Sequence, residues 1–199
     1  MQTRLPTEER QAEIVAAALR LASASSPALI TTGDIAEAIG VTQGAVFKHF
    51  PTKDAIWLAA MRWVRESLLR ALQGAVAQAR TPRDALHAMF TTHVEFVIAH
   101  PGVPRVIFHE LQQSADSAAK LEVRAVLQGY RKLLLAVLGQ AVAQRQIGAD
   151  VDPEAAATAF IGLVQGLVMQ SMLAGRPAAM RQQAERVFAL YLRGTGAAS

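Results

Sequence analysis

A short stretch near the N-terminus, GVTQGAVFKHFPTK, carries four polar side chains whose chemistry suits nucleic acid: Gln43, Lys48, His49 and Lys53. A glutamine amide pairs with adenine through two hydrogen bonds, and lysine and histidine reach phosphate oxygens. Val46 and Phe50 are four residues apart and fall on one face of a helix. The stretch therefore predicts a helix with one face in a core and the opposite face free to contact DNA.

A second short helix must precede this one to hold it in place. The spacing of Ile35 and Ile39 predicts a helix over 32–39, and Gly40 suits the positive φ that often ends a helix. The next helix is predicted over 43–49. Two short helices joined by a turn of about three to four residues form the helix-turn-helix motif, whose second helix enters the major groove.

Other residues of this motif add candidate DNA contacts. Gly44 allows the backbone to approach the duplex closely, and Ala45 offers a methyl group to thymine. Thr32 and Thr42 present a hydroxyl and a backbone N–H at helix N-termini, which favour anions. The predicted DNA-binding residues are Thr32, Thr42, Gln43, Gly44, Ala45, Phe47, Lys48, His49 and Lys53. The alternative is a plain helical hairpin whose polar face is only solvated.

The segment ITTGDIAEAIGVTQGAVFKHFPTKDAIW, residues 30–57, resembles the DNA-binding segment of TetR/AcrR-family transcriptional repressors. The matching positions are Ile35-Ala36, Gly40-Val41-Thr42, Gly44, Phe47-Lys48-His49-Phe50 and Lys53. The family often has threonine at the position of Ala45 and tyrosine at that of Phe47, so this chain lacks two hydroxyl groups that could bond phosphate. We expect Phe47 to pack against the DNA backbone and Ala45 to contact the groove.

Composition restricts the class of protein. The chain has 199 residues, 52% apolar and 18% charged, which indicates a folded chain with a sizeable core. It has no cysteine, which excludes disulfides and cysteine nucleophiles and suits a reducing cytosol. The net charge is +4, but residues 1–53 carry five basic and five acidic side chains, so bulk charge gives no support to DNA binding. The N-terminus shows no apolar signal segment, and we expect a cytoplasmic protein.

Helical periodicity and capping residues predict an all-α fold of about nine helices. The expected ranges are 8–23, 32–39, 43–49, 53–79, 83–99, 103–112, 116–146, 153–174 and 178–193. We expect a three-helix helix-turn-helix DNA-binding domain over 1–52. A larger helical domain follows over 53–199, and the resemblance implies that it binds a ligand and dimerises. Residues 155–175 lack charge over the length of a membrane span, but their glutamine, serine and glycine content favours a buried helix.

Apolar and aromatic side chains recur at helical spacing through this larger domain. The resemblance implies a pocket for a small effector, lined by Trp63, Phe90, His93, Val97, Phe108, Gln112, Tyr130, Leu134, Gln165 and Met169. The same stripes could form a closed core, and the sequence leaves both interpretations open. No cofactor is expected. The spacing of His93, His100 and His109 fits no metal site, so none is predicted.

The helix over 153–174 carries small residues on one face, which lets another backbone approach closely. The resemblance implies that this helix and the last one pair with their copies in a homodimer. The expected interface residues are Ala155, Ala159, Gly162, Gly166, Val187, Leu190 and Tyr191. The alternative is that the same stripe packs inside one chain.

The resemblance implies a ligand-responsive dimeric repressor that a small apolar or amphipathic effector releases from a palindromic DNA operator. An enzyme is the second hypothesis, but the sequence has no GxSxG, no HExxH, no glycine-rich phosphate loop and no cysteine. We therefore expect no enzymatic activity. A third hypothesis is a helical module that acts through protein contacts, which the neutral charge of residues 1–53 favours.

Overall fold

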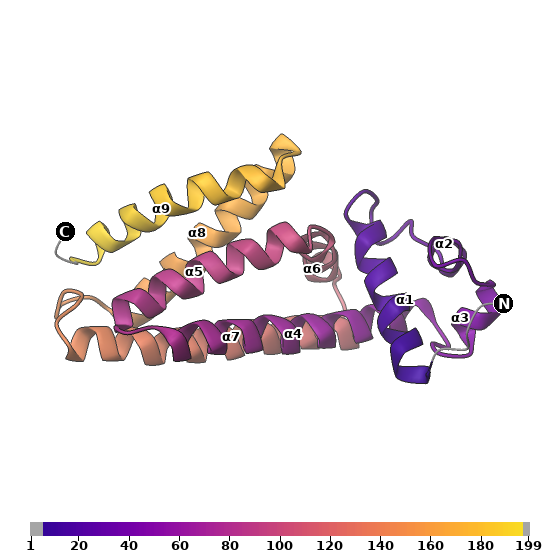
Figure 1. The fold of residues 1–199 in the computed structure, drawn as a ribbon, viewed down its shortest axis with the longest axis horizontal. Coiled ribbons are helices and arrows are strands. Elements are labelled where there is room, and N and C mark those ends of the chain that lie inside the picture. Colours follow the sequence, from indigo (N-terminus) through magenta and orange to yellow (C-terminus); the bar gives the residue numbers. More distant parts are fainter. Residues whose placement is uncertain (1–5, 197–199) are drawn as a thin grey trace. The chain divides into compact units, whose positions relative to one another are not determined.

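The computed structural model of the chain describes residues 6–196. Over those residues the fold is nine α-helices and one short 3₁₀ helix without a strand, which confirms the all-α prediction (Figure 1). The elements are α1 (Thr7–Ala22), α2 (Thr32–Ala38), α3 (Gln43–Phe47), α4 (Lys53–Gln78), α5 (Pro82–Ala99), α6 (Gly102–Gln112), α7 (Ala118–Ala143), α8 (Pro153–Ala174), η1 (Pro177–Ala179) and α9 (Met180–Gly194).

The helix α7 differs most from its predicted range of 116–146. It starts late because the Ser117 hydroxyl accepts a hydrogen bond from the Lys120 N–H at 2.9 Å, in the manner of an N-cap. It ends early because Arg145 has a φ of 57°, a left-handed conformation that stops a helix. Both ends are therefore set by local backbone and capping geometry.

One compact unit comprises the chain up to Glu66 together with His100–Ala125. In it α1 packs against α2 and α6, and α2 packs against α3. Gly102 lies so close to the α1 backbone that a Cβ on it would come within 1.9 Å of the Leu19 carbonyl oxygen. Only glycine allows α6 to begin at this distance from α1.

The second compact unit comprises Ser67–Ala99 and the chain from Val126 onwards. There α9 packs against α5 and α8. Buried aromatic rings join these helices: the Phe90 and Phe160 centroids are 5.3 Å apart, and those of Phe160 and Tyr191 are 5.4 Å apart, both edge to face. The predicted functional boundary after residue 52 stays a prediction, because compactness groups the start of α4 with α1–α3.

Candidate nucleic-acid interface

Side-chain caps fix the starts of α2 and α3. The Asp34 N–H donates to Thr31 Oγ1 at 3.1 Å, and the Thr31 N–H donates to the Asp34 carboxylate at 2.8 Å. The backbone bond and the hydroxyl bond from Thr31 hold the pKa of Asp34 below its usual range. At α3 the Ala45 N–H donates to Thr42 Oγ1 at 3.2 Å. Both short helices therefore begin at a residue fixed by its own cap.

The turn and the buried face hold α3 against α2. Gly40 has a φ of 67°, which a residue with a Cβ rarely adopts. The Val41 N–H then reaches back to the Ala36 carbonyl at 2.9 Å. Ile35 and Val46 are fully buried, and Phe50 is 7% exposed. The predicted inward face of the motif is confirmed.

The nine predicted DNA-binding residues differ in exposure. Five are exposed on α3 and at its ends: Thr42, Gln43, Gly44, Phe47 and Lys48. Ala45, His49 and Lys53 are half-buried, and Thr32 is buried. The structure thus brings five of the nine together on the outer side of α3.

Thr32, at the start of α2, contacts Gln43 at the start of α3. Its side chain is 7% exposed, and its Oγ1 accepts a hydrogen bond from Gln43 Nε2 at 2.7 Å. A hydroxyl group in this position contacts a protein side chain rather than bulk solvent. The predicted DNA contact of Thr32, through its hydroxyl or its backbone N–H, stays a prediction.

Lys53 also has partners within the protein. Its Nζ donates to the Ala28 carbonyl at 3.0 Å and lies 3.5 Å from the Pro27 carbonyl, both in the loop between α1 and α2. The ammonium group therefore links the start of α4 to that loop. The predicted contact with phosphate requires that the Lys53 ammonium group divide its N–H donors between the phosphate and these carbonyls.

Lys48 and His49 follow α3 and differ in environment. Lys48 is exposed, and its ammonium group has no hydrogen bond or ion pair with any residue of 6–196. The His49 carbonyl accepts from Gln11 Nε2 at 3.4 Å. His49 Nδ1 is buried without a hydrogen-bond partner in the described part of the chain. Lys48 is thus the cation of this set that is free to bind phosphate.

The ten predicted effector residues fall in both compact units. Trp63, Phe108 and Gln112 belong to the first, where the Trp63 ring meets His100 edge to face at a centroid distance of 4.9 Å. The second unit holds the others, and its buried or half-buried members are Phe90, His93, Val97, Tyr130 and Leu134.

His93 and Tyr130 form a polar pair within the aromatic core of the second unit. His93 Nδ1 lies 3.3 Å from the Tyr130 hydroxyl, and the ring centroids are 5.2 Å apart. Burial lowers the pKa of His93 to about 4. Burial, and then the charge of nearby Tyr191, raise the pKa of Tyr130 well above its usual range. Both groups are neutral near pH 7. Each can therefore donate or accept one hydrogen bond with the other, or with a polar group of a ligand.

Three of the predicted effector residues are exposed and do not line an interior wall: Gln112, Gln165 and Met169. The helix α8 packs inward through Phe160, Val164 and Leu167. Gln165 and Met169 consequently point away from the core. The sequence of α8 is apolar on nearly all sides, so its periodicity does not show which face turns inward.

The predicted dimer residues of α8 all lie on its open face. Ala155, Ala159, Gly162 and Gly166 are exposed, and the same spacing continues through Met169 and Leu173, which are 44% and 77% exposed. We call these six residues the α8 stripe. Met169 and Leu173 are not among the predicted interface residues, although they continue the same spacing of three and four residues.

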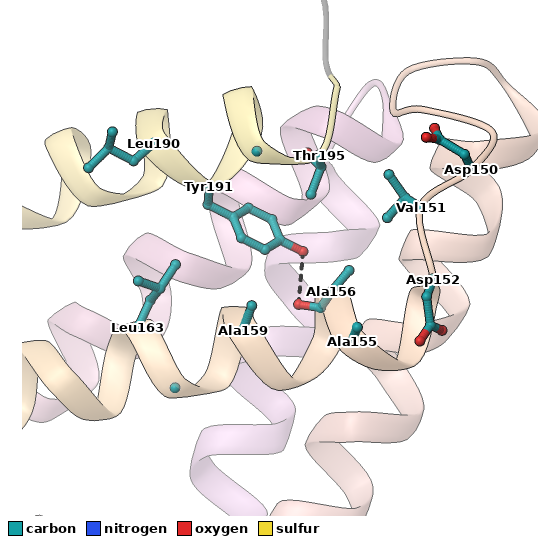
Figure 2. A pocket seen from close by; sticks show the side chains of 12 residues that line it. Asp150, Val151, Asp152, Ala155, Ala156, Ala159, Leu163, Leu190, Tyr191 and Thr195 are labelled. Carbon is teal, nitrogen blue, oxygen red and sulfur yellow. Dashed lines mark hydrogen bonds between the residues drawn. The ribbon is translucent and has the colours of Figure 1, made fainter.

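The predicted dimer residues of α9 are divided. Leu190 is 60% exposed and Val187 is half-buried. Tyr191 is 6% exposed, and its hydroxyl donates to the Ala156 carbonyl at 3.2 Å (Figure 2). Burial raises the pKa of Tyr191. This side chain joins α9 to α8 within one protomer, and its predicted place in a dimer interface stays a prediction.

A hollow of about 800 Å³ lies between the last turns of α9 and the first half of α8. Figure 2 shows Tyr191 reaching across it from α9 to the carbonyl of Ala156 on α8. Small residues of the α8 stripe, among them Ala155, Ala159 and Gly162, form part of its wall. The hollow thus continues the open face of α8 onto α9.

Two family models match the chain. Residues 14–60 match the model described as bacterial regulatory proteins, tetR family, and residues 109–187 match the model described as tetracyclin repressor-like, C-terminal domain. The first of these segments contains the whole α2–turn–α3 element. The second runs from α6 into α9.

The chain is also similar, at low sequence identity, to curated proteins. The nucleoid occlusion factor SlmA of Haemophilus ducreyi is 26% identical over 123 residues, which are 61% of this chain and 61% of the relative. The chain thus spans less than two thirds of that relative. The same-named protein of a Marinomonas strain is 20% identical over 160 residues, 80% of this chain and 81% of the relative.

Solved structures show the same fold. The fatty acid degradation regulator FadR of Bacillus halodurans superposes with a TM-score of 0.83 at 19% identity, over 99% of this chain and 100% of that one. A tetR-family regulatory protein from Rhodococcus RHA1 gives a TM-score of 0.77 at 25% identity, over 95% and 98%. FadR of Bacillus subtilis, solved in complex with stearoyl-CoA, gives 0.79 at 17% identity, over 92% and 98%.

Proposed function

We propose that this chain, which belongs to the TetR family of bacterial regulatory proteins, is a dimeric cytoplasmic repressor that leaves a palindromic operator when a small effector binds. Proteins of this family are DNA-binding transcription regulators rather than enzymes. Family membership leaves open which residues contact DNA, which face forms the dimer and which kind of effector binds.

The observation that carries the DNA-binding role is the two-sided environment of α3. Val46 is fully buried, whereas Gln43, Phe47 and Lys48 on the other side are exposed. Phe47 is 46% exposed, and the ammonium group of the adjacent Lys48 has no partner in residues 6–196. We propose that Gln43 and Gly44 face the bases and that Lys48 binds phosphate.

The open face of α8 supports a homodimer. A palindromic operator is read by a two-fold protein, with recognition helices about 34–36 Å apart. The α8 stripe and Leu190 form an exposed apolar surface without a charged side chain among them. We propose that the copy of this surface in a second protomer covers it.

The second unit supports an apolar or amphipathic effector. Its core contains aromatic rings and a neutral polar pair, His93 and Tyr130. Side chains of this kind would suit a ligand with an apolar body and one hydrogen-bonding group. The similar protein from Bacillus subtilis was solved with stearoyl-CoA, and we propose a ligand with an apolar chain or ring system for this chain.

Selection of the purified protein against random DNA duplexes tests the DNA-binding role. We expect enrichment of a palindrome whose half-sites are about one helical turn apart. The retained sequence would then serve in a screen for compounds that release the protein. Absence of enrichment at low salt would contradict the proposal and favour a module that acts through protein contacts.

The dimer face is tested by sedimentation of two matched variants. Ala159→Arg places a charge in the α8 stripe, and Ala136→Arg places the same charge on an exposed position of α7. We expect the first variant to be monomeric and the second to remain dimeric, with both keeping wild-type helix content. Equal association of the two variants would place the dimer contact elsewhere.

A further inference from the structure

The structure shows a contact between the two helices of the motif that the family resemblance does not supply. Thr32 is the first residue of α2, and Gln43 is the first residue of α3. Gln43 Nε2 donates to Thr32 Oγ1 at 2.7 Å. The two residues are 11 positions apart, so the bond forms only when both helices are in place.

The frame around this bond is fixed on both sides. Thr31 and Asp34 cap each other at the start of α2, and Thr42 caps α3 one residue before Gln43. Thr32 itself is buried, at 7% exposed, which disfavours a rotamer that turns its hydroxyl toward solvent. The acceptor oxygen therefore occupies a defined position, and it fixes the orientation of the exposed Gln43 amide.

The bond determines which hydrogen-bonding groups Gln43 offers to DNA. A glutamine amide has two N–H donors on one nitrogen and one acceptor oxygen. Donation to Thr32 uses one N–H, so one N–H and Oε1 remain. Adenine presents an acceptor and a donor in the major groove, which match this remaining pair. Guanine presents two acceptors, and the amide no longer has two donors for them.

We infer that Thr32 is a positioning residue that makes Gln43 select adenine over guanine. This inference rests on the proposed function, since it concerns specificity within the same DNA-binding surface. It assigns Thr32 an indirect role, in contrast to a contact with phosphate. A phosphate contact would contribute to binding of every sequence equally.

The test compares base preference in four proteins selected against random duplexes: wild type, Thr32→Val, Thr32→Ser and Gln43→Ala. Valine keeps the shape of threonine without the hydroxyl, and serine keeps the hydroxyl. We expect Thr32→Val to lower the adenine-to-guanine ratio at one position of each half-site by about five-fold, the effect of one neutral hydrogen bond. Thr32→Ser should retain the wild-type ratio, and Gln43→Ala should lose it.

The double variant Thr32→Val/Gln43→Ala separates positioning from direct contact. If Thr32 acts through Gln43, the double variant should show the base preference and the affinity of Gln43→Ala. A uniform loss of affinity for all sequences, in both the wild-type and the Gln43→Ala background, would overturn the inference and restore the phosphate contact. Thermal unfolding of each variant identifies any general loss of folding.

A measurement without DNA keeps this inference distinct from the proposed function. The side-chain amide protons of Gln43 should exchange slowly in the NMR spectrum of the wild type and faster in Thr32→Val. Wild-type protein that enriches no sequence but shows this protection would contradict the proposed function only. Equal exchange in both proteins would overturn the positioning role of Thr32.

Discussion

Replacement of Lys53 by methionine tests whether its ammonium group stabilises the protein in the absence of DNA. The bond to the Ala28 carbonyl, at 3.0 Å, has good geometry, whereas the 3.5 Å contact with the Pro27 carbonyl is at the limit of a hydrogen bond. One hydrogen bond from a charged group contributes about 1.5–3 kcal/mol, and partial exposure favours the lower value. Methionine keeps most of the apolar stem. We therefore expect a loss of about 1.5 kcal/mol and a fall in Tm of about 3–6 °C.

Lys48→Met is the matched control, because that side chain is exposed and has no partner in residues 6–196. Its Tm should stay close to that of the wild type, since such surface changes are usually within about 0.5 kcal/mol. In DNA titrations it should weaken binding to operator and random duplexes alike and lower the salt slope by about one. If Lys53→Met kept the wild-type Tm and lowered the salt slope instead, the stabilising role of Lys53 would be refuted.

Substitutions at three glycines and the titration of His93 test further features of the packing. Gly102→Ala would bring a Cβ against the α1 backbone and should cost about 3 kcal/mol or more; Gly74→Ala meets no atom within 4 Å and should stabilise by about 0.5–1 kcal/mol in urea unfolding. Because the pKa of His93 is lowered to about 4 in the folded state, the contribution of this residue to the free energy of unfolding should be constant above about pH 7. It should fall from about pH 6.5 to about pH 4, by at most about 1.4 kcal/mol per unit, as the unfolded chain binds the proton first. His93→Gln should flatten that part of the pH profile. Gly44→Ala has only Thr42 Oγ1, at 4.0 Å, near its new Cβ, so the fold should keep its Tm while operator affinity falls; unchanged affinity would show that this backbone does not approach the duplex.

The parts of the motif that depend on nearby residues could be predicted from the sequence. The Thr31–Asp34 cap spans three positions, and the inward pair of Val46 and Phe50 spans four. The positive φ of Gly40 follows from its place at a helix end. Each of these features is decided within one helical turn, and so residue type and spacing contain the information.

The parts that depend on contacts between segments could not be predicted in this way. The chemistry of Thr32, Gln43 and Lys53 predicts that each contacts DNA. What the sequence does not show is that Gln43 meets Thr32 across 11 positions and Lys53 meets Ala28 across 25. A donor or acceptor that already has a partner in the protein offers DNA fewer hydrogen bonds than a free one.

The helix α8 shows why apolar length alone is an ambiguous signal. Among residues 6–196 it is long and apolar enough to cross a membrane by composition. Its inner face, however, packs on α5 and α9, and the Tyr191 hydroxyl donates to the Ala156 carbonyl on this helix. On the other face, four of the six residues of the α8 stripe are alanine or glycine, which favour close approach of another helix. A helix that packs against its own protomer on one face and against a second copy on the other would be apolar on both, and the homodimer proposed above would account for that composition.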